Sequence, residues 1–184
     1  MSDKWVTYLS LDADEKQAST AVDDIVSWLL EREVIAPMSR LDRFYGQYRE
    51  GSRFAEAFDP AQVPLSAIAG GTYILFGVRA EKEWTMSTNM NSFEPPPCPQ
   101  CSVPIADSRM GELMTQWNDS RTEPVTTCVE CGHSDLLGNW QHILGGYCNY
   151  GSISFVNAFP LLDEFDEELL ARIGPRPRKL YVHL

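Results

Sequence analysis

The apolar positions of the chain follow two periods, which predict where strands and helices lie. WVTYLSL, residues 5–11, is rich in β-branched and aromatic side chains, and its apolar density predicts a strand buried on both faces. From Thr20 the apolar residues recur at the period of a helix, and Thr20 with Asp23 forms the signature of a helix start. Pro37 excludes continuation of that helix. We therefore expect an opening strand followed by an amphipathic helix that packs on a sheet.

The middle of the chain is less regular but ends in a clear strand. Between residues 39 and 62, LDRFYGQY is compatible with a strand interrupted at Gly46, and SRFAEAFD with a short helix. GGTYILFGVRA, residues 70–80, predicts a strand entered through a glycine pair. EWTMST, which follows, is expected to return beside it.

The C-terminal segment predicts strands on either side of one helix. The run from Gly138 to Pro160 predicts two strands around a glycine-rich turn. FDEELLARIG predicts a helix that ends at Gly174, and RKLYVHL predicts a final strand.

Three consecutive prolines, residues 95–97, indicate a module boundary, because they hold the chain extended and fit neither a regular helix nor a central strand. We divide the chain into residues 1–93 and 139–184, which together form an α+β domain, and an inserted module at 94–138. The outer segments predict β-α-β units around one sheet. The predicted class is α+β, a ferredoxin-like or related α/β sandwich with an inserted four-cysteine zinc ribbon, and its strand order is left open.

Two CxxC pairs lie in the inserted module, and they predict one structural Zn²⁺ site formed by Cys98, Cys101, Cys128 and Cys131. Each CxxC turn directs two thiolates to one point, and two turns complete the tetrahedral sulfur environment that zinc prefers. The gap between the pairs has room for a hairpin and a short helix such as GELMTQWND. With all four positions filled by protein no place is left for water, so the metal would stabilise structure and not catalyse.

The cysteine-rich region has other interpretations than a zinc site. Four free or redox-active thiols are the main alternative, which two pairs in one module make the weaker one. His133 follows the second pair and could replace a cysteine, although four thiolates already complete the shell. Cys148 lies far from both pairs in sequence and is expected to be a small buried side chain.

Charge disfavours nucleic acid as a partner. The 184 residues carry 26 acidic and 15 basic side chains, a formal net charge of −11, which repels phosphate backbones and favours basic partners. Within the module, Arg109 and Arg121 are the only arginines and there is no lysine. We expect no nucleic-acid binding by the module.

The sequence contains no phosphate-binding loop, HExxH helix or GxSxG elbow, so we expect the protein not to be an enzyme. A basic leader and a long apolar run are also missing. We therefore expect a cytoplasmic protein without a membrane partner.

The run DEFDEE concentrates carboxylates at the start of the predicted C-terminal helix. Such a cluster commonly complements the helix dipole and keeps one face solvated. It is also a candidate docking patch for a basic protein, formed by Asp163, Glu164, Asp166, Glu167 and Glu168.

Several motifs of the C-terminal half resemble those of a widespread group of uncharacterised bacterial proteins. They are CPQC, the TTCVECG knuckle, the region of Trp140, the aromatic run ending in NAFP and the terminal GPRPRKLYVHL. Proteins of this group are often mislabelled as sugar-transporter ATPases, a label that the missing phosphate loop contradicts. WLLEREVI and RFYGQYREGSRFAEA resemble the same group more loosely. Members look like accessory genes beside polymorphic or type VI secretion toxins. The resemblance therefore implies an immunity protein that binds and inhibits a bacterial toxin.

We carry two hypotheses forward. The first is a non-catalytic inhibitor that binds a basic toxin, such as a nuclease, through acidic surface. The second is a nucleic-acid accessory factor, or an enzyme of unknown reaction, that uses the ribbon as a platform. Its discriminating feature would be a compact basic face formed by Arg40, Arg43, Arg49 and Arg53.

Overall fold

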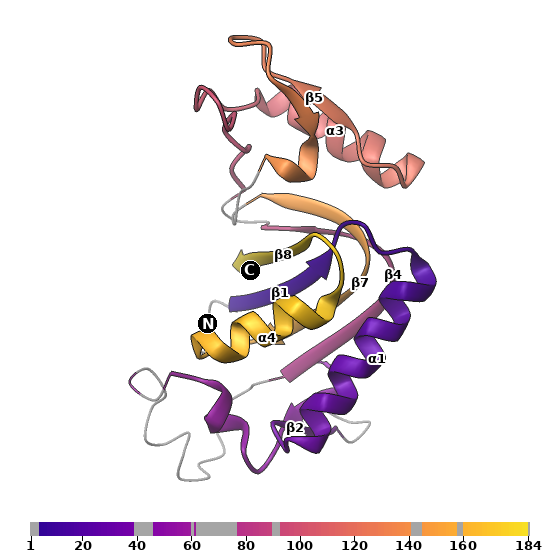
Figure 1. Ribbon diagram of the computed structural model, residues 1–184, viewed down its shortest axis with the longest axis vertical. Coiled ribbons are helices and arrows are strands. Elements are labelled where there is room, and N and C mark those ends of the chain that lie inside the picture. The colour runs from indigo at the N-terminus through magenta and orange to yellow at the C-terminus, as the bar shows by residue number, and fades with distance from the viewer. Residues whose placement is uncertain are drawn as a thin grey trace.

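The computed structural model describes residues 4–38, 46–59, 61, 77–89, 93–140, 145–157 and 160–183. Within these ranges the chain forms three α-helices, a six-stranded sheet and a two-stranded sheet, so the expected α+β class is confirmed (Figure 1). The elements are β1 (Lys4–Ser10), α1 (Glu15–Glu31), β2 (Ile35–Pro37), β3 (Tyr48–Glu50), the 3-10 helix η2 (Phe54–Ala57), β4 (Gly77–Thr88), α3 (Asp107–Ser120), β5 (Val125–Thr127), β6 (Ser134–Leu136), the 3-10 helix η3 (Leu137–Asn139), β7 (Gly146–Val156), α4 (Asp163–Ile173) and β8 (Pro177–His183).

The large sheet has the strand order β2-β3-β4-β7-β1-β8, and its described pairings are antiparallel. β1 lies between β7 and β8, with Val6 opposite Phe155 on one side and Tyr181 on the other. Four neighbouring strands of this sheet are β4, β7, β1 and β8. Along the chain, these strands and two helices occur in the order β1-α1-β4-β7-α4-β8, with further elements between some of them. α1, with β2 and β3 after it, lies between β1 and β4 along the chain, and α4 lies between β7 and β8, so each of these two connections joins strands that are separated by a third.

α1 begins earlier than the sequence predicts. Asp14 caps the helix, since its carboxylate accepts the Gln17 N–H at 2.8 Å while the Gln17 side chain accepts the Asp14 N–H at 3.1 Å. This reciprocal pair satisfies two amide groups that would otherwise lack partners. Thr20, the predicted start, lies inside the helix, where its hydroxyl donates to the Lys16 carbonyl.

Two predicted pairs of strands are instead single long strands. EWTMST does not turn back but continues β4, and the run after Gly145 forms β7 without a turn. Gly151 lies within β7 at φ +65, opposite a shift in register where β4 has two residues, Lys82 and Glu83, against this one glycine, so the bulge belongs to β4. A Cβ at this position would lie 2.9 Å from that of Ala18, so the glycine also allows α1 to approach the sheet closely. Residues 70–76 of the predicted strand lie outside the described residues.

The remaining predicted elements agree with the structure where it describes them. SRFAEAFD contains the short helix η2, and α4 ends at Gly174, whose φ of +125 suits glycine. RKLYVHL lies in β8. Of LDRFYGQY, residues 41–45 lie outside the described residues.

Both faces of the sheet are covered (Figure 1). α1 and α4 pack on one face, where Val6, Tyr8 and Phe155 belong to the larger apolar core. The opposite face packs against the segment from residue 93 to 140, here called the cysteine module, through Leu9 and Leu180. The alternation of Tyr8 and Leu9 between the two cores confirms the prediction that the first strand is buried on both faces.

Candidate metal centre

The first cysteine turn is closed by main-chain hydrogen bonds. The Cys98 N–H donates to the Val103 carbonyl at 2.8 Å, and the Ser102 N–H donates to the Cys98 carbonyl at 2.8 Å. The Gln100 N–H is directed at Cys98 Sγ, 3.4 Å away. An N–H that points at sulfur favours the thiolate over the thiol. This turn therefore forms one half of a metal site from local interactions.

The second turn, which follows β5, repeats that geometry. The Cys128 N–H donates to the His133 carbonyl at 2.8 Å, and the Gly132 N–H donates to the Cys128 carbonyl at 3.0 Å. The two turns match in conformation as well, because Ser102 and Gly132, each four residues after the first cysteine of its pair, have φ of +63 and +74. A residue in the left-handed region is what lets the chain reverse so tightly.

The four predicted cysteines come together in one cluster. Their Sγ atoms all lie within 4.8 Å of one another, with Cys98 to Cys131 at 3.6 Å and Cys101 to Cys128 at 3.5 Å. Sulfur atoms at the corners of a tetrahedron about 2.3 Å from a central zinc would lie about 3.8 Å apart. The cluster can therefore hold a metal ion, and the donor set fits zinc.

The cluster is buried on its inner side and exposed to solvent on its outer side. Cys98 and Cys128 are buried in the core that the cysteine module shares with the sheet, together with Trp117 of α3, whereas Cys131 is exposed. A metal held there would tie both turns to α3 and to the sheet. Four protein ligands would fill every position around a tetrahedral metal ion held there.

Protonation of the metal-free cluster is unequal among the thiols. The N–H groups of Cys131 and Glu130 lower the pKa of Cys128 to about 7. The hydrogen bond from the Val103 main chain acts in the same direction on Cys101, but burial and the neighbouring thiols outweigh it and raise the pKa of Cys101 to about 12. The main-chain N–H groups directed at Cys128 favour its thiolate, which is the form that binds a metal ion.

His133 and Cys148 lie outside the cluster, in agreement with the sequence interpretation. The His133 ring packs beside Trp140, with centroids 5.9 Å apart and planes at 34°. Cys148 is buried in β7, and burial raises its pKa to about 12. Such a thiol behaves as a small apolar side chain.

An arginine that the sequence analysis missed joins the cysteine module to the sheet. Arg176, next to β8, donates to Glu123 at 2.7 and 3.0 Å, to Asn139 at 2.9 Å and to Asp12 at 2.7 Å. Glu123 also accepts the Gly138 N–H at 2.6 Å. The only local signal is GPRPR, which shows no partner, since the partners are 37 to 164 residues away in sequence.

The structure divides the predicted acidic docking patch into two parts. Asp166 binds the Tyr8 hydroxyl and pairs with Lys179 at 2.7 Å. Glu168 pairs with Arg32 at 2.9 Å and with Arg172 at 2.7 Å. Each of these two carboxylates is thus paired with at least one basic side chain, which offsets its charge. The remaining three are exposed at the start of α4, namely Asp163, Glu164 and Glu167.

The basic face required by the nucleic-acid hypothesis is not assembled in the part that the structure describes. Arg49 is exposed on β3, but Arg53 pairs with Glu56 at 2.6 Å, which offsets its charge. Arg40 and Arg43 lie outside the described residues.

Comparisons with protein-family models, with curated proteins and with solved structures found no match for this chain. The resemblance described above therefore stays a prediction. Among the described residues, no helix has both the length and the apolar character needed to span a bilayer.

The paired turns predict opposite effects of two substitutions. Gly132→Ala should lower the free energy of unfolding by about 1 kcal/mol, because alanine is strained at positive φ. Its Cβ would have no atom within 4 Å, so no clash adds to this cost. Ser102→Gly should raise stability by about 0.5 kcal/mol, since it relieves the same strain. Urea denaturation of the metal-loaded protein measures both, and equal midpoints for the two variants would contradict the prediction.

Proposed function

We propose that the cluster binds one zinc ion and that the cysteine module is a zinc-ribbon type of module on a ferredoxin-like core. Support for the core comes from the β-α-β-β-α-β connection and from the order β4-β7-β1-β8. Support for zinc comes from four thiolates at tetrahedral spacing. The ion would supply structure, and all of its ligands would belong to this chain.

The function best supported is that of a non-catalytic, cytoplasmic protein that binds and inhibits a basic partner, as an immunity protein does to a bacterial nuclease toxin. The observation that carries this proposal is the closed cysteine cluster within a chain of net charge −11. A closed site leaves no open position for substrate, and strong negative charge speeds association with a basic protein while weakening wrong pairings. Reduced cysteines are in keeping with the cytoplasm.

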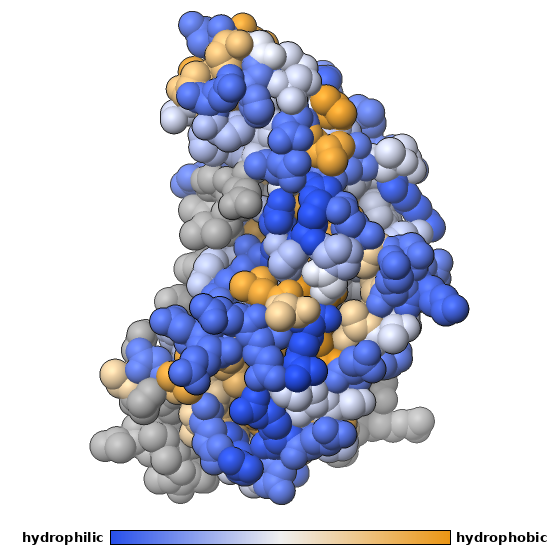
Figure 2. Space-filling view, viewed as in Figure 1, coloured by the Kyte–Doolittle hydropathy of each residue, from blue (hydrophilic) through white to orange (hydrophobic). Residues whose placement is uncertain are grey.

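The exposed surface supports an electrostatic mode of binding. Figure 2 shows one face of the molecule as largely hydrophilic, with small separate apolar patches. The carboxylates of Asp163, Glu164 and Glu167 add negative charge at the start of α4. Steering by such charges acts mainly on the association rate and weakens with salt.

Co-expression with the product of the neighbouring gene tests this function. If that product is a toxin, the wild-type chain should form a complex with it and restore growth. The triple variant Asp163→Asn, Glu164→Gln, Glu167→Gln should slow association about tenfold at low salt. Asp24→Asn removes one exposed carboxylate on α1, away from the start of α4, and should slow association by less than about twofold. A toxic neighbour that neither binds this chain nor is neutralised by it would refute the proposal.

A further inference from the structure

The cysteine module contains a pocket that the sequence analysis did not predict. Its volume is about 420 Å³, within the usual range of roughly 300–1,000 Å³ for ligand pockets. It lies between the first cysteine turn, the start of α3 and the strand β5 that leads into the second turn. Its apolar lining includes Pro95, Val103, Pro104, Ile105 and Val129.

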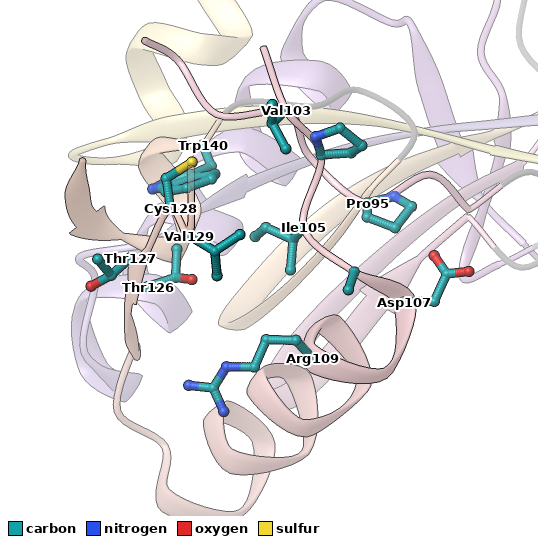
Figure 3. A pocket seen from close by; sticks show the side chains of 12 residues that line it. Pro95, Val103, Ile105, Asp107, Arg109, Thr126, Thr127, Cys128, Val129 and Trp140 are labelled. Carbon is teal, nitrogen blue, oxygen red and sulfur yellow. The ribbon is translucent and has the colours of Figure 1, made fainter. Parts of the chain in front are cut away.

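One wall of this pocket is an apolar side chain without cover. Val129, between the two cysteines of the second turn, is 96% exposed. Figure 3 shows the side chains of Val129 and Ile105 directed toward each other across the pocket, with Arg109 of α3 beyond them. An exposed apolar side chain on a hydrogen-bonded turn beside an apolar hollow is the arrangement that receives a partner's anchor side chain.

The charged groups around the pocket determine whether a positively or a negatively charged segment binds there. Asp107 lines it and is exposed, whereas the guanidinium of Arg109 is paired with Glu112 at 2.9 Å. Glu130 follows Val129 and is exposed. Cys128 also lines the pocket, so a zinc-loaded cluster would place a net charge of about −2 next to it. The local field is therefore negative.

We infer that this pocket is the docking site for a protein segment with one large apolar side chain flanked by lysine or arginine. The inference rests on the proposed function and names the contact surface for it. The apolar side chain enters between Ile105 and Val129, and the flanking cations face Asp107, Glu130 and the metal centre. Apolar burial supplies affinity, and charge complementarity excludes neutral and acidic segments.

Peptide titration of the full-length, zinc-loaded, ¹⁵N-labelled protein tests the inference without any natural partner. The probes are Lys-Lys-Phe-Lys-Lys, the same peptide with serine in place of phenylalanine, and Glu-Glu-Phe-Glu-Glu. The first should shift the amide signals of Val103, Thr126 and Val129 and bind about tenfold more tightly than either other peptide. Equal binding by the serine peptide would overturn the anchor, and equal binding by the acidic peptide would overturn the charge selection.

Two valines of the module provide a matched pair of variants. Val129→Ser should weaken the binding of Lys-Lys-Phe-Lys-Lys about tenfold, because the exposed apolar contact area is lost. Val125→Ser changes a valine that is 59% exposed but does not line the pocket, so affinity should stay within about twofold. Since both side chains are exposed, neither variant should unfold the protein. Equal loss in both variants, or in neither, would overturn the docking site.

The outcome separates this inference from the proposed function. Peptides that fail to bind would remove the pocket as a docking site, while co-expression could still show inhibition through another surface. Peptides that bind as expected, with a toxic neighbour that is not inhibited, would keep the docking site and refute the immunity role.

Discussion

Cys98→Ser is expected to abolish stoichiometric metal binding and to unfold the cysteine module. Serine oxygen is a poor ligand for zinc, and the remaining three thiolates would leave one position open. Structural zinc contributes on the order of 10 kcal/mol to the folding of small modules. Cys98 is also one of the two buried ligands, so its loss leaves a polar group in the shared core.

The effect should extend beyond the cysteine module. Leu9, Leu180 and Val182 lie on the face of the sheet that the module covers. Loss of the module would expose this apolar face to water, and the whole chain should unfold at a lower temperature. The zinc content measured by elemental analysis should fall from one ion per chain to well below one. The near-ultraviolet circular dichroism of the buried Trp117 and Trp140 should also weaken.

Cys148→Ala is the matched control, because Cys148 is buried but does not belong to the cluster. It should keep one zinc per chain and lose only about 1 kcal/mol of stability from the altered packing. A chelator should reproduce the effect of Cys98→Ser in the wild-type protein. A Cys98→Ser protein with full metal content and an unchanged melting temperature would show that Cys98 is not a ligand.

The cluster could be predicted from sequence because each of its halves is local. A CxxC turn depends on a few consecutive residues, and the need of zinc for four ligands then joins Cys98 and Cys101 to a second pair that is distant in sequence. The first strand was predictable for the same reason, since its apolar density is a property of seven adjacent residues. What covers its second face could not be derived, because that depends on the packing of the module.

Signals from glycine and from charge were less informative. The glycine-rich run around Gly151 is typical of a turn in sequence, but this glycine adopts its left-handed conformation within one long strand, opposite a bulge of β4. The acidic run at residues 163–168 is visible in the sequence, but the sequence does not show which of its carboxylates are paired with basic side chains. Asp166 is bound by Tyr8, 158 residues away, and Glu168 by Arg32, 136 residues away. Local composition gives the number of charges and not their partners.

Glu123→Gln is expected to loosen the junction between the cysteine module and the sheet. The side chains of Arg176 and Glu123 are only 20% and 11% exposed, and Glu123 binds both the arginine and the Gly138 N–H. A glutamine would present an amide NH₂ to one of these donors and remove the charge that offsets Arg176. Breaking a largely buried pair in this way should cost about 2 kcal/mol of unfolding free energy. For a chain of this size the melting temperature should fall by about 4–8 °C.

Asp12→Asn is the matched control for this junction, since Asp12 also binds Arg176 but its side chain is 45% exposed. Water and salt screen the ion pair between Asp12 and Arg176, so its loss should lower the free energy of unfolding by less than about 1 kcal/mol. Hydrogen exchange then locates the effect: in Glu123→Gln the amides of α3, β5 and β6 should exchange faster, while those of β1 and β7 should lose less protection. If Glu123→Gln costs no more than Asp12→Asn, or if exchange rises equally in the sheet and the module, the Arg176 contacts do not hold the two together. The packing of Leu9, Leu180 and Val182 would then have to hold the module on the sheet alone.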